Sequence, residues 1–382
     1  MSVNDPYILI EHGPDQRAQA FCAPSELICA WDIEDVSTAF GALERARAQG
    51  KWLAGFTSYE LGYALEEKLH ALMPARRRAP LMCFGVFDAP DPLAAEAMLA
   101  QGQSLAAGAE LSAPKPTWSE AEYASAFDQV AGYIRAGDFY QTNLTFPMQA
   151  HYSGTPLGLY AKLWAKQAVG YGALVNLGQG PILLSRSPEL FFQVDQNRMI
   201  ETRPMKGTMP RGATADEDAA NKAFLARDTK NRAENLMIVD LLRNDISRVA
   251  ELGSVNVPEL FTVETYATVH QMTSLVRARL KQALSLDDLF KALFPCGSIT
   301  GAPKIRAMQV IRDLEDQARD AYCGSIGWIA PDGRMCFNVA IRTLKLFEDK
   351  SVQLNVGGGV VYDSTAASEY QEALLKSAYA RL

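Results

Sequence analysis

Strand-like and helix-like segments are interspersed along this chain of 382 residues without a regular strand–helix–strand rhythm. A doubly wound parallel sheet needs that rhythm, because each parallel strand must be joined to the next by a long crossover connection. The order of the segments therefore favours an α+β fold over a parallel α/β fold.

The composition narrows the class of protein. Hydrophobic residues make up 48% and charged residues 21% of the chain, which is the balance of a soluble globular protein. No apolar run approaches the roughly 20 residues of a membrane span, and the opening MSVNDPYILIEHG has no basic stretch before an apolar one. We therefore expect neither a membrane segment nor a secretory signal. A net charge of −7 without a compact Lys/Arg field argues against nucleic-acid binding.

The cysteines and histidines give no sign of a zinc site. No C-x-x-C pair is present, and the four histidines lack metal-ligand spacing. Scattered cysteines in a chain of this size are typical of reduced thiols, so we expect a cytoplasmic protein. The six cysteines are Cys22, Cys29, Cys83, Cys296, Cys323 and Cys336.

The chain divides into three regions by composition. Residues 1–85 mix short apolar runs with turns and are expected to form an N-terminal segment of the fold. Residues 86–118 are rich in Ala, Gly and Pro, which predicts a surface excursion or linker. Residues 119–382 carry the long periodic segments and are expected to form the main body of the fold.

Polar side chains line one face of a predicted strand near residue 141. A helix is predicted before it, opened by a capping box of Thr117 and Glu120 and closed at Gly137. In the strand FYQTNLTF, alternation places Gln141, Asn143 and Thr145 on one face. Amide and hydroxyl groups are unusual on a core strand, so this face predicts a pocket wall.

Three further elements are expected. Residues 231–250 predict a helix, and WIAPDGRMCFNVAIRTLKLF predicts a hairpin with its turn at Asp332-Gly333. The last helix is expected to begin near Ser368. The apolar stripe of the first helix is Leu236, Val239, Leu242, Ile246 and Val249.

Lys206 lies in IETRPMKGTMPRG, between residues with special backbone preferences. Pro204 biases the preceding residue toward extended structure, and Gly207 can adopt angles closed to other residues. We therefore expect Lys206 on a constrained turn. It is either an exposed surface lysine or, if burial lowers its pKa, a nucleophile.

Three glutamates are candidates for a metal site. Glu369 and Glu372 share one face of the last helix, and Glu234 lies in the first half of the 231–250 helix. Acids in a first helical turn also complement the helix dipole, so that alternative stays open. If the two helix ends meet, the carboxylates would suit Mg²⁺.

Two small-residue segments are candidates for anion binding. Gly357, Gly358 and Gly359 interrupt a strand, which is costly unless a backbone or ligand approaches closely. GSITGAPK, which contains Thr300 and Gly301, precedes a helix and offers backbone amides. On the adjacent hairpin, alternation places Arg342 on the face away from Val339 and Ile341. There the guanidinium either holds a carboxylate or faces solvent.

Two more residues have suggestive surroundings. His270, in TYATVHQMTS, is either a hydrogen-bonded structural residue or a catalytic one. Glu189 follows Pro188 on a turn between apolar runs, where a carboxyl tends to have a raised pKa and can donate a proton. From the residues alone we expect an Mg²⁺-dependent enzyme acting on a small anionic substrate.

Taken together, these segments resemble the chorismate-utilising enzymes, which include anthranilate synthase component I, aminodeoxychorismate synthase component I, and the isochorismate and salicylate synthases. The resemblance implies their fold, in which large antiparallel sheets pack in a sandwich with helices outside. It covers roughly residues 119–382 and is weaker over residues 1–85. The matching segments, in the family's order, are GDFYQTNL, SRSPELFF, TRPMKGT, NRAENLMIVDLLRND, VHQMTS, GSITGAPK, IRTL, GGGVV and SEYQE.

The resemblance implies roles for the candidate residues. Glu234, Glu369 and Glu372 resemble the Mg²⁺ cluster, and Glu189 resembles the acid that helps a ring hydroxyl leave. His270 matches the histidine near the ring. Arg342, Tyr322 and the three glycines resemble the carboxylate-binding wall. Position 231 is Asn where relatives often carry an acid, which leaves one contact near the metal in doubt.

Two positions distinguish the branches of the family. Isochorismate-type members carry a lysine where this chain has Gln141, so the glutamine implies ammonia as the nucleophile. Anthranilate synthases carry a small residue where Lys206 stands, and a lysine there resembles the aminodeoxychorismate branch. In that branch the lysine is thought to attack ring carbon 2, and Mg²⁺ with Arg203 or Arg342 would favour its neutral form.

Alternatives and partners remain to be tested. The alternatives are an anthranilate synthase, which would release pyruvate, and a non-catalytic member that binds chorismate or tryptophan. The chain lacks the glycine-flanked nucleophilic cysteine of a glutamine amidotransferase, and Cys296 in FPCGSIT comes nearest. We therefore expect a separate glutaminase subunit to supply ammonia and a separate lyase to form 4-aminobenzoate.

Overall fold

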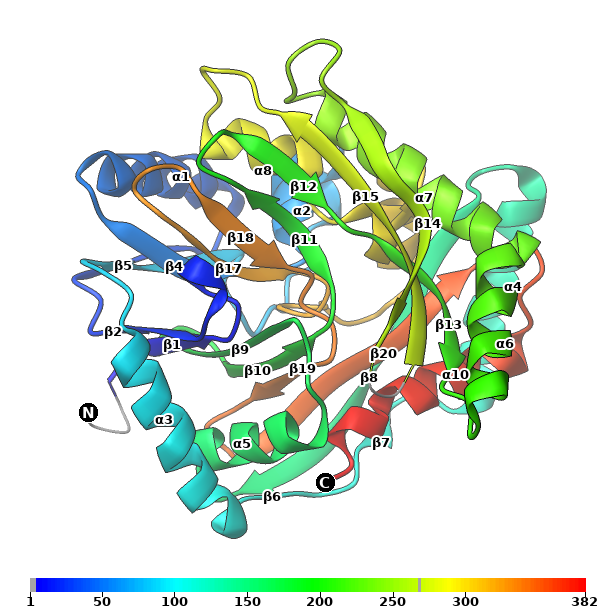
Figure 1. The fold of residues 1–382 in the computed structure, drawn as a ribbon, viewed down its shortest axis with the longest axis horizontal. Coiled ribbons are helices and arrows are strands. Elements are labelled where there is room, and N and C mark those ends of the chain that lie inside the picture. The colour runs from blue at the N-terminus through cyan, green and yellow to red at the C-terminus, as the bar shows by residue number, and fades with distance from the viewer. Residues whose placement is uncertain (1–4, 267–268) are drawn as a thin grey trace.

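The computed structural model describes residues 5–266 and 269–382. Residues 1–4, which open the segment where we expected no secretory signal, and residues 267–268, beside His270, lie outside the described residues. Within the described part, most strands belong to two antiparallel sheets of ten strands each (Figure 1).

The first sheet is built around the long neighbours β8 and β20, which pair from Thr142 with Val360 to His151 with Ser351. In sheet order its strands are β16 (Gly301–Ala302), β8 (Gln141–Ser153), β20 (Ser351–Val360), β19 (Thr343–Leu346), β10 (Ile182–Ser187), β9 (Tyr171–Asn176), β1 (Tyr7–Ile10) and β2 (Gln19–Cys22), and β6 (Glu110–Leu111) and β7 (Lys115–Pro116) also pair with β8.

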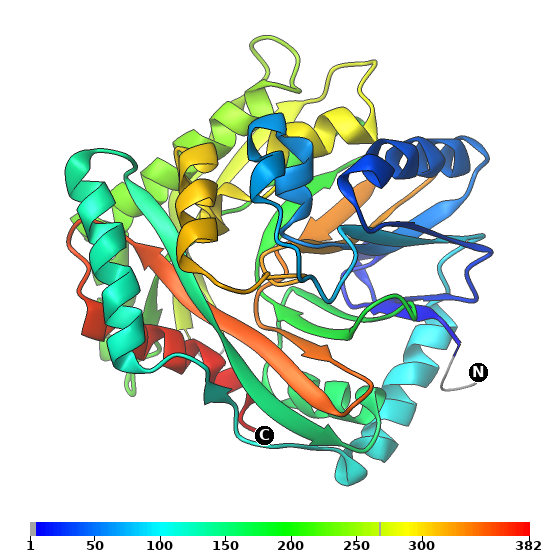
Figure 2. The ribbon, with the colours of Figure 1, turned by 180° about the vertical axis from the view of Figure 1, so that it is seen from behind.

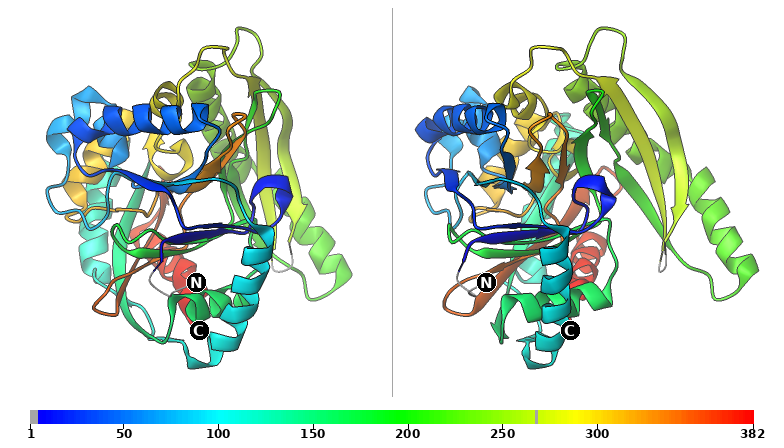
Figure 3. Two further views of the ribbon diagram at one scale, coloured as in Figure 1. Left: turned by 90° about the vertical axis from the view of Figure 1, so that its left-hand side faces the viewer. Right: turned by 60° about the vertical axis from the view of Figure 1, so that its left-hand side comes forward.

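The second sheet carries the strand that contains Lys206 at one end. In sheet order its strands are β13 (Met205–Pro210), β15 (Val269–Arg279), β12 (Met199–Thr202), β11 (Leu190–Val194), β18 (Met335–Asn338), β17 (Ser325–Ile329), β4 (Trp52–Thr57), β5 (Met82–Phe87) and β3 (Glu26–Ala30), and β14 (Asn256–Thr265) also pairs with β15. Figure 3 shows β14 and β15 with α6 extending to one side of the body.

Helices cover the outer faces of the two sheets (Figures 1 and 2). The helices are α1 (Ile33–Ala48), α2 (Leu61–Leu65), α3 (Pro92–Leu105), α4 (Glu120–Ala136), α5 (Pro156–Lys166), α6 (Ala215–Arg227), α7 (Thr229–Ser247), α8 (Leu286–Leu293), α9 (Lys304–Leu314) and α10 (Ala366–Lys376). Short 3₁₀ turns are η1 (Pro14–Gln16), η2 (Glu67–Leu72), η3 (Ala106–Gly108), η4 (Gly297–Ile299) and η5 (Ser377–Ala380).

Apolar side chains from both sheets meet in a central core. Ile8 and Val175 of the first sheet and Phe56 and Trp328 of the second belong to the same buried cluster. Two larger clusters pack the helices onto the outer faces of the sheets. This arrangement confirms the expected α+β sandwich with helices outside.

Three local predictions from the sequence are wrong. The capping box before the 120–136 helix is formed by Ser119 and Glu122, two residues later than expected, because the hydroxyl of Thr117 donates to Pro147 O instead. Leu236 is 43% exposed, since α7 turns Asn235 and Ile238 inward with the rest of the stripe. The last helix begins at Ala366, capped by Thr365.

The predicted hairpin is real but shorter than expected. β17 and β18 pair around a turn at Gly333, whose φ is +92°. The chain then leaves this sheet and enters the first sheet as β19. Arg342 lies in the connection between the sheets with φ of +51°, so strand alternation does not determine its direction and that argument was wrong.

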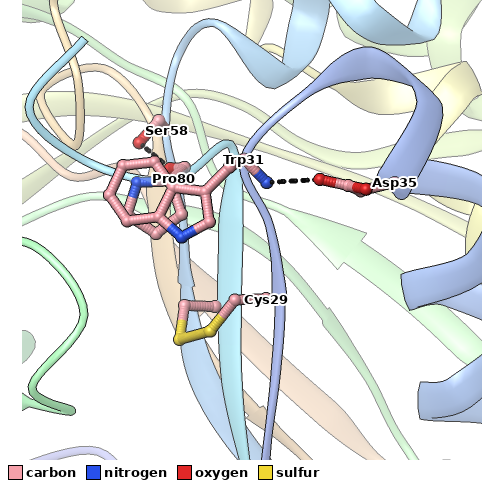
Figure 4. Close-up of a disulfide and its surroundings, with 6 residues drawn as sticks. Cys29, Trp31, Asp35, Ser58 and Pro80 are labelled. Atoms are coloured by element: carbon pink, nitrogen blue, oxygen red, sulfur yellow. Dashed lines mark hydrogen bonds between the residues drawn. A yellow bond between two sulfur atoms is a disulfide. The ribbon is translucent and has the colours of Figure 1, made fainter.

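The expectation that all cysteines are reduced is wrong for one pair. Cys29 and Cys83 form a disulfide between β3 and β5 (Figure 4). They are direct partners in this antiparallel ladder, with Cα atoms 4.1 Å apart. A separation of 54 residues in sequence gave no signal of this pairing. The other four cysteines are free thiols.

The segment 86–118 contains more regular structure than its composition suggests. It includes the end of β5 and the whole of α3, whose N-cap Asp91 accepts hydrogen bonds from the amides of Leu93 and Ala94. Gly102 of α3 lies against α5, where an added Cβ would be 3.1 Å from Leu157 O. The segment therefore packs on the outside of the first sheet as a helix.

Candidate active site

Lys206 lies on β13 and not on the expected turn. The register of β13 against β15 shifts between Met205 and Thr208, so the backbone is irregular at the lysine. Gly207 has φ of +84°, and an added Cβ would lie 2.7 Å from Asn231 Oδ1. Glycine therefore lets β13 approach the first turn of α7 closely.

Four segments that are distant in sequence meet around the Lys206 amine. Glu234 Oε2 of α7 lies 3.9 Å from Lys206 Nζ. A Cβ added to Gly359 of β20 would lie 3.2 Å from the same nitrogen and 2.8 Å from Gln141 Nε2 of β8. The side chain of Lys206 is only 19% exposed, so Lys206 is not the exposed surface lysine that the sequence left as an alternative.

The surroundings of Lys206 favour its neutral form. Burial lowers the pKa of Lys206, and the nearby ammonium of Lys376 lowers it further, while Glu234 and Glu372 act in the opposite direction. Arg203 takes no part, because it is paired with Glu259 at 2.9 Å and Glu264 at 2.7 Å on β14. The cation that assists is Lys376, which the sequence argument missed.

Glu189 is a buried carboxyl in the connection between β10 and β11. It is 6% exposed, and burial raises its pKa from 4.5 to about 7, against the hydroxyl of Ser298 and the charges of Lys206 and Arg342. Ser298 Oγ donates to Glu189 Oε1 at 2.7 Å. The raised pKa expected from the sequence is confirmed, and such a group can hold a proton near neutral pH.

Arg342 offers a free guanidinium beside this carboxyl. Burial lowers its pKa, and Tyr379 and Glu189 are the neighbours that oppose this effect. Within residues 5–266 and 269–382, no protein hydrogen bond to its side chain is present. An unpartnered guanidinium is suited to a carboxylate. Tyr322 is buried in the core cluster that packs beneath α7 and α8.

The glycines of β20 are required by close approaches on both sides. Gly357 pairs with Thr145, and an added Cβ there would lie 2.2 Å from Leu144 O. A Cβ on Gly358 would lie 3.0 Å from Glu369 Oε2 and 3.3 Å from Lys376 Nζ. Gly357 therefore allows close pairing with β8, and the bare backbone at Gly358 leaves room for the side chains of α10.

The carboxylates of α10 are held by hydrogen bonds and by Lys376. Ser364 Oγ donates to Glu369 Oε1 at 2.6 Å, and Lys376 Nζ lies 2.8 Å from Glu372 Oε1 and 2.9 Å from Gly357 O. Burial, followed by the charge of Glu372, raises the pKa of Glu369. Burial by itself would raise the pKa of Glu372, but the charge and the hydrogen bond of Lys376 lower this pKa overall.

The three predicted metal ligands are only partly brought together. Glu369 and Glu372 both face Gly358, whereas Glu234 lies beside Lys206. In the part of the chain that is described, no cluster of three or more His, Cys, Asp or Glu side chains has the geometry of a metal site. Two carboxylates completed by waters and an anionic substrate still fit the chemistry of Mg²⁺.

Gln141 presents a buried amide without a partner. The residue is fully buried, and neither Oε1 nor Nε2 has a hydrogen-bond partner among the residues that the structure describes. Leaving such a group unsatisfied costs about 1–3 kcal/mol. The orphaned amide beside Lys206 is therefore suited to a ligand.

The loop that contains Thr300 and Gly301 forms the edge of the first sheet next to Gln141. Thr300 O accepts from Asn143 N at 2.8 Å, and Gly301 pairs with Thr142. A Cβ on Gly301 would lie 2.2 Å from Gln141 O, so the loop lies directly against β8.

His270 and Asn231 have structural contacts. His270 Nε2 lies 2.9 Å from Asp218 Oδ1 and Nδ1 lies 3.1 Å from Thr265 Oγ1, which ties α6 to β14 and β15. The described residues provide no contact between His270 and Lys206. Asn231 Nδ2 donates to the N-cap residue Asp228 at 2.8 Å and holds its oxygen against Gly207.

Comparisons with known proteins agree with this architecture. A family model described as chorismate binding enzyme matches residues 6–381. A relative from Klebsiella aerogenes named aminodeoxychorismate synthase component 1 is 43% identical over 344 residues, which is 84% of this chain and 74% of the relative. The Escherichia coli (strain K12) protein of the same name is 47% identical over 255 residues, 67% of this chain and 56% of that protein.

A solved structure shows the same fold. Anthranilate synthase component I from Streptococcus pneumoniae TIGR4 superposes with a TM-score of 0.79 at 26% identity, covering 100% of this chain and 93% of that one. The expected anthranilate-synthase-component-I-like fold is confirmed.

Proposed function

The chain belongs to the chorismate-binding enzyme family, and on that premise we propose that it converts chorismate and ammonia to 4-amino-4-deoxychorismate. The observation that carries this proposal is the buried Lys206, whose pKa is lowered by burial, near the unpartnered amide of Gln141. A lysine at this position distinguishes the aminodeoxychorismate branch, and the two similar relatives carry that name.

The first step needs a neutral amine and a proton donor. The nitrogen of Lys206 forms a bond to ring carbon 2, both conjugated double bonds of the ring shift by one position, and the bond from carbon 4 to its hydroxyl breaks. Glu189 gives its proton to the departing hydroxyl, which leaves as water. Burial raises the pKa of Glu189 to about 7 and lowers the pKa of Lys206, and both directions support the roles proposed for them in this step.

The second step reverses the shift. Ammonia forms a bond to carbon 4, both double bonds return to their original positions, and Lys206 leaves carbon 2 as a neutral amine. The new ammonium group returns one proton to the Glu189 carboxylate, so the protons balance over the two steps. The amide of Gln141 is proposed to orient ammonia, because it flanks Gly359 together with Lys206.

Anion binding is proposed for Arg342, the glycine strand and the loop of Thr300 and Gly301. We also propose that Glu369 and Glu372, with Glu234, hold Mg²⁺. When bound, Mg²⁺ would offset the negative charge of these carboxylates and favour the binding of an anionic substrate. His270 is retained as a candidate residue near the ring, and Tyr322 as a candidate residue of the carboxylate-binding wall.

Ammonia is proposed to come from glutamine through a separate glutamine amidotransferase subunit. The name component 1 carried by the relatives supports a partner subunit. Cys296 is not suited to hydrolyse glutamine, because burial and the charge of Glu189 raise the pKa of its thiol to about 12. A separate lyase would convert the product to 4-aminobenzoate for folate synthesis.

Among the described residues, no helix is long and apolar enough to cross a membrane. We propose that the chain works in the cytoplasm, as its bacterial relatives suggest. Cell fractionation with immunodetection would test this proposal.

The function is tested by incubating the purified chain with chorismate, Mg²⁺ and an ammonium salt and identifying the product. We expect 4-amino-4-deoxychorismate without pyruvate. Pyruvate and anthranilate would support the anthranilate synthase alternative, and binding without turnover would support a non-catalytic member. With glutamine as the only nitrogen donor, we expect no sustained turnover until a glutaminase subunit is added.

A further inference from the structure

We propose that Ser298 is a positioning residue for Glu189, holding one carboxyl oxygen so that the other carries the proton transferred to the leaving hydroxyl. The inference rests on the proposed function, in which Glu189 is the acid. It concerns a hydroxyl on the 3₁₀ turn η4, outside the set of residues that touch the substrate in that proposal.

The contact between the two side chains is short and specific. Ser298 Oγ donates to Glu189 Oε1 at 2.7 Å, and within the described part of the chain Oε2 makes no hydrogen bond. The two oxygens of the carboxyl are therefore not equivalent. A protonated carboxyl accepts at its carbonyl oxygen and carries its proton on the other, so this geometry places the proton on Oε2.

A buried thiol lies on the other side of the Ser298 hydroxyl. Cys296 Sγ lies 3.2 Å from Ser298 Oγ, and the residue is 3% exposed. The hydroxyl has a single hydrogen, and this hydrogen is donated to Glu189. Ser298 Oγ can therefore only accept from the thiol of Cys296, so the thiol does not compete with Glu189 for the hydroxyl hydrogen.

The backbone of Glu189 is fixed independently of Ser298. Ser187 Oγ accepts from Glu189 N at 3.2 Å and donates to Val339 O at 2.6 Å, while Val339 N donates to Glu189 O at 3.0 Å. The remaining freedom lies in the carboxyl group itself. Ser298 removes that freedom, which is the task of a positioning residue.

The other groups that act on Glu189 are few. Lys206 from β13 and Arg342 from the connection after β18 stabilise its ionised form. The thiols of Cys296 and Cys323 also interact electrostatically with Glu189. Both stay protonated, because burial raises the pKa of each thiol to about 12. Ser298 is the uncharged donor among these neighbours, so its removal changes the proton affinity of Glu189 without changing any charge.

The test compares Ser298→Ala with Ser298→Thr by measuring kcat/KM as a function of pH. Glu189 must be protonated to act, so activity falls as pH rises through its pKa. The Ser298 hydroxyl stabilises the ionised carboxylate, and its loss should move this alkaline limb upward by about one pH unit. We also expect kcat to fall about tenfold in the Ala variant, since a misplaced acid loses part of its effect.

Ser298→Thr keeps a hydroxyl and should keep the alkaline limb in place. Cys296→Ser, which replaces one donor by another, should do the same. Circular dichroism and thermal unfolding confirm that the variants are folded. An unmoved limb in Ser298→Ala, or a limb displaced equally in Ser298→Thr, would overturn the inference, because a purely structural defect lowers the rate at every pH.

A second readout separates this inference from the proposed function. The infrared band of the Glu189 carboxyl, identified by its loss in Glu189→Gln, reports the titration of that group without any turnover. If the wild-type chain makes no 4-amino-4-deoxychorismate, the proposed function fails. If the band titrates at the same pH in wild type and Ser298→Ala, the positioning role fails, whatever the reaction is.

Discussion

Glu189→Gln should strongly lower turnover and at the same time stabilise the folded chain. The buried carboxyl has a pKa raised from 4.5 to about 7, so its ionised form is disfavoured in the folded state relative to the unfolded one. Gln has nearly the same shape, remains neutral, and keeps an oxygen that can accept the Ser298 hydrogen bond. The substitution therefore removes an electrostatic cost while leaving the packing in place.

The magnitude follows from linkage between protonation and folding. A group whose folded pKa is raised contributes its full stability below the unfolded value and loses it as pH rises through the folded value. Here the loss lies between about pH 4.5 and 7. With 1.36 kcal/mol per pKa unit, the variant should gain about 1 kcal/mol in unfolding free energy at pH 5 and about 3 kcal/mol at pH 8.

Urea denaturation followed by tryptophan fluorescence at pH 5, 6.5 and 8 measures this gain. Glu96→Gln on the exposed face of α3 is the matched control, and its effect on stability should not change with pH. A gain for Glu189→Gln that is constant across this range, or a loss of stability at pH 8, would refute the claim that burial of the carboxyl sets its pKa. Turnover should fall by about 10²- to 10⁴-fold, as expected for a general acid.

Three other substitutions test the site. Lys206→Ala should lower turnover by roughly 10³-fold or more with the fold intact, and mass spectrometry of the wild type without ammonia should detect an adduct on Lys206. Full activity of the variant at all ammonia concentrations would contradict the nucleophile role. Glu369→Gln should raise the Mg²⁺ concentration for half activity by roughly tenfold, measured by titration after chelation, and unchanged turnover in excess chelator would rule the metal out. Gly359→Ala should lower kcat at least about tenfold with little change in thermal unfolding, because its Cβ would lie 2.8 Å from Gln141 Nε2 and would displace a catalytic side chain. A wild-type kcat would show that the close approach of Gly359 to Gln141 is unimportant.

Several local elements could be predicted from the sequence, because their signals act over a few residues. The helix over 231–250, the strand that begins at Gln141, and the turn at Gly333 all follow from periodicity or backbone preference. The same short-range signals misplaced the cap at Thr117 and the stripe residue Leu236. In both cases the competing interaction is with another element, which no local pattern reports.

Chemical candidates could also be selected from the sequence, but their partners could not. Glycine inside a strand indicated a close approach, and Glu189 between apolar runs indicated a raised pKa. That Gly358 faces Glu369, or that Lys376 supplies the cation near Lys206, depends on α10 packing against β20. The signal for Lys376 was its position four residues after Glu372, which local reasoning explains equally well as a surface pair.

What the sequence determined was the kind of protein and most of its reactive groups, since residue types and short spacings are properties of the chain itself. What only the tertiary structure decided was which groups meet. Lys206, Glu234 and Gly359 come from strands and helices far apart in sequence, and their proximity exists because two sheets and two helices pack around one place. The pKa values of Lys206 and Glu189 follow from the same packing, because burial, which is the largest influence on each, is a property of the folded molecule and of no single segment.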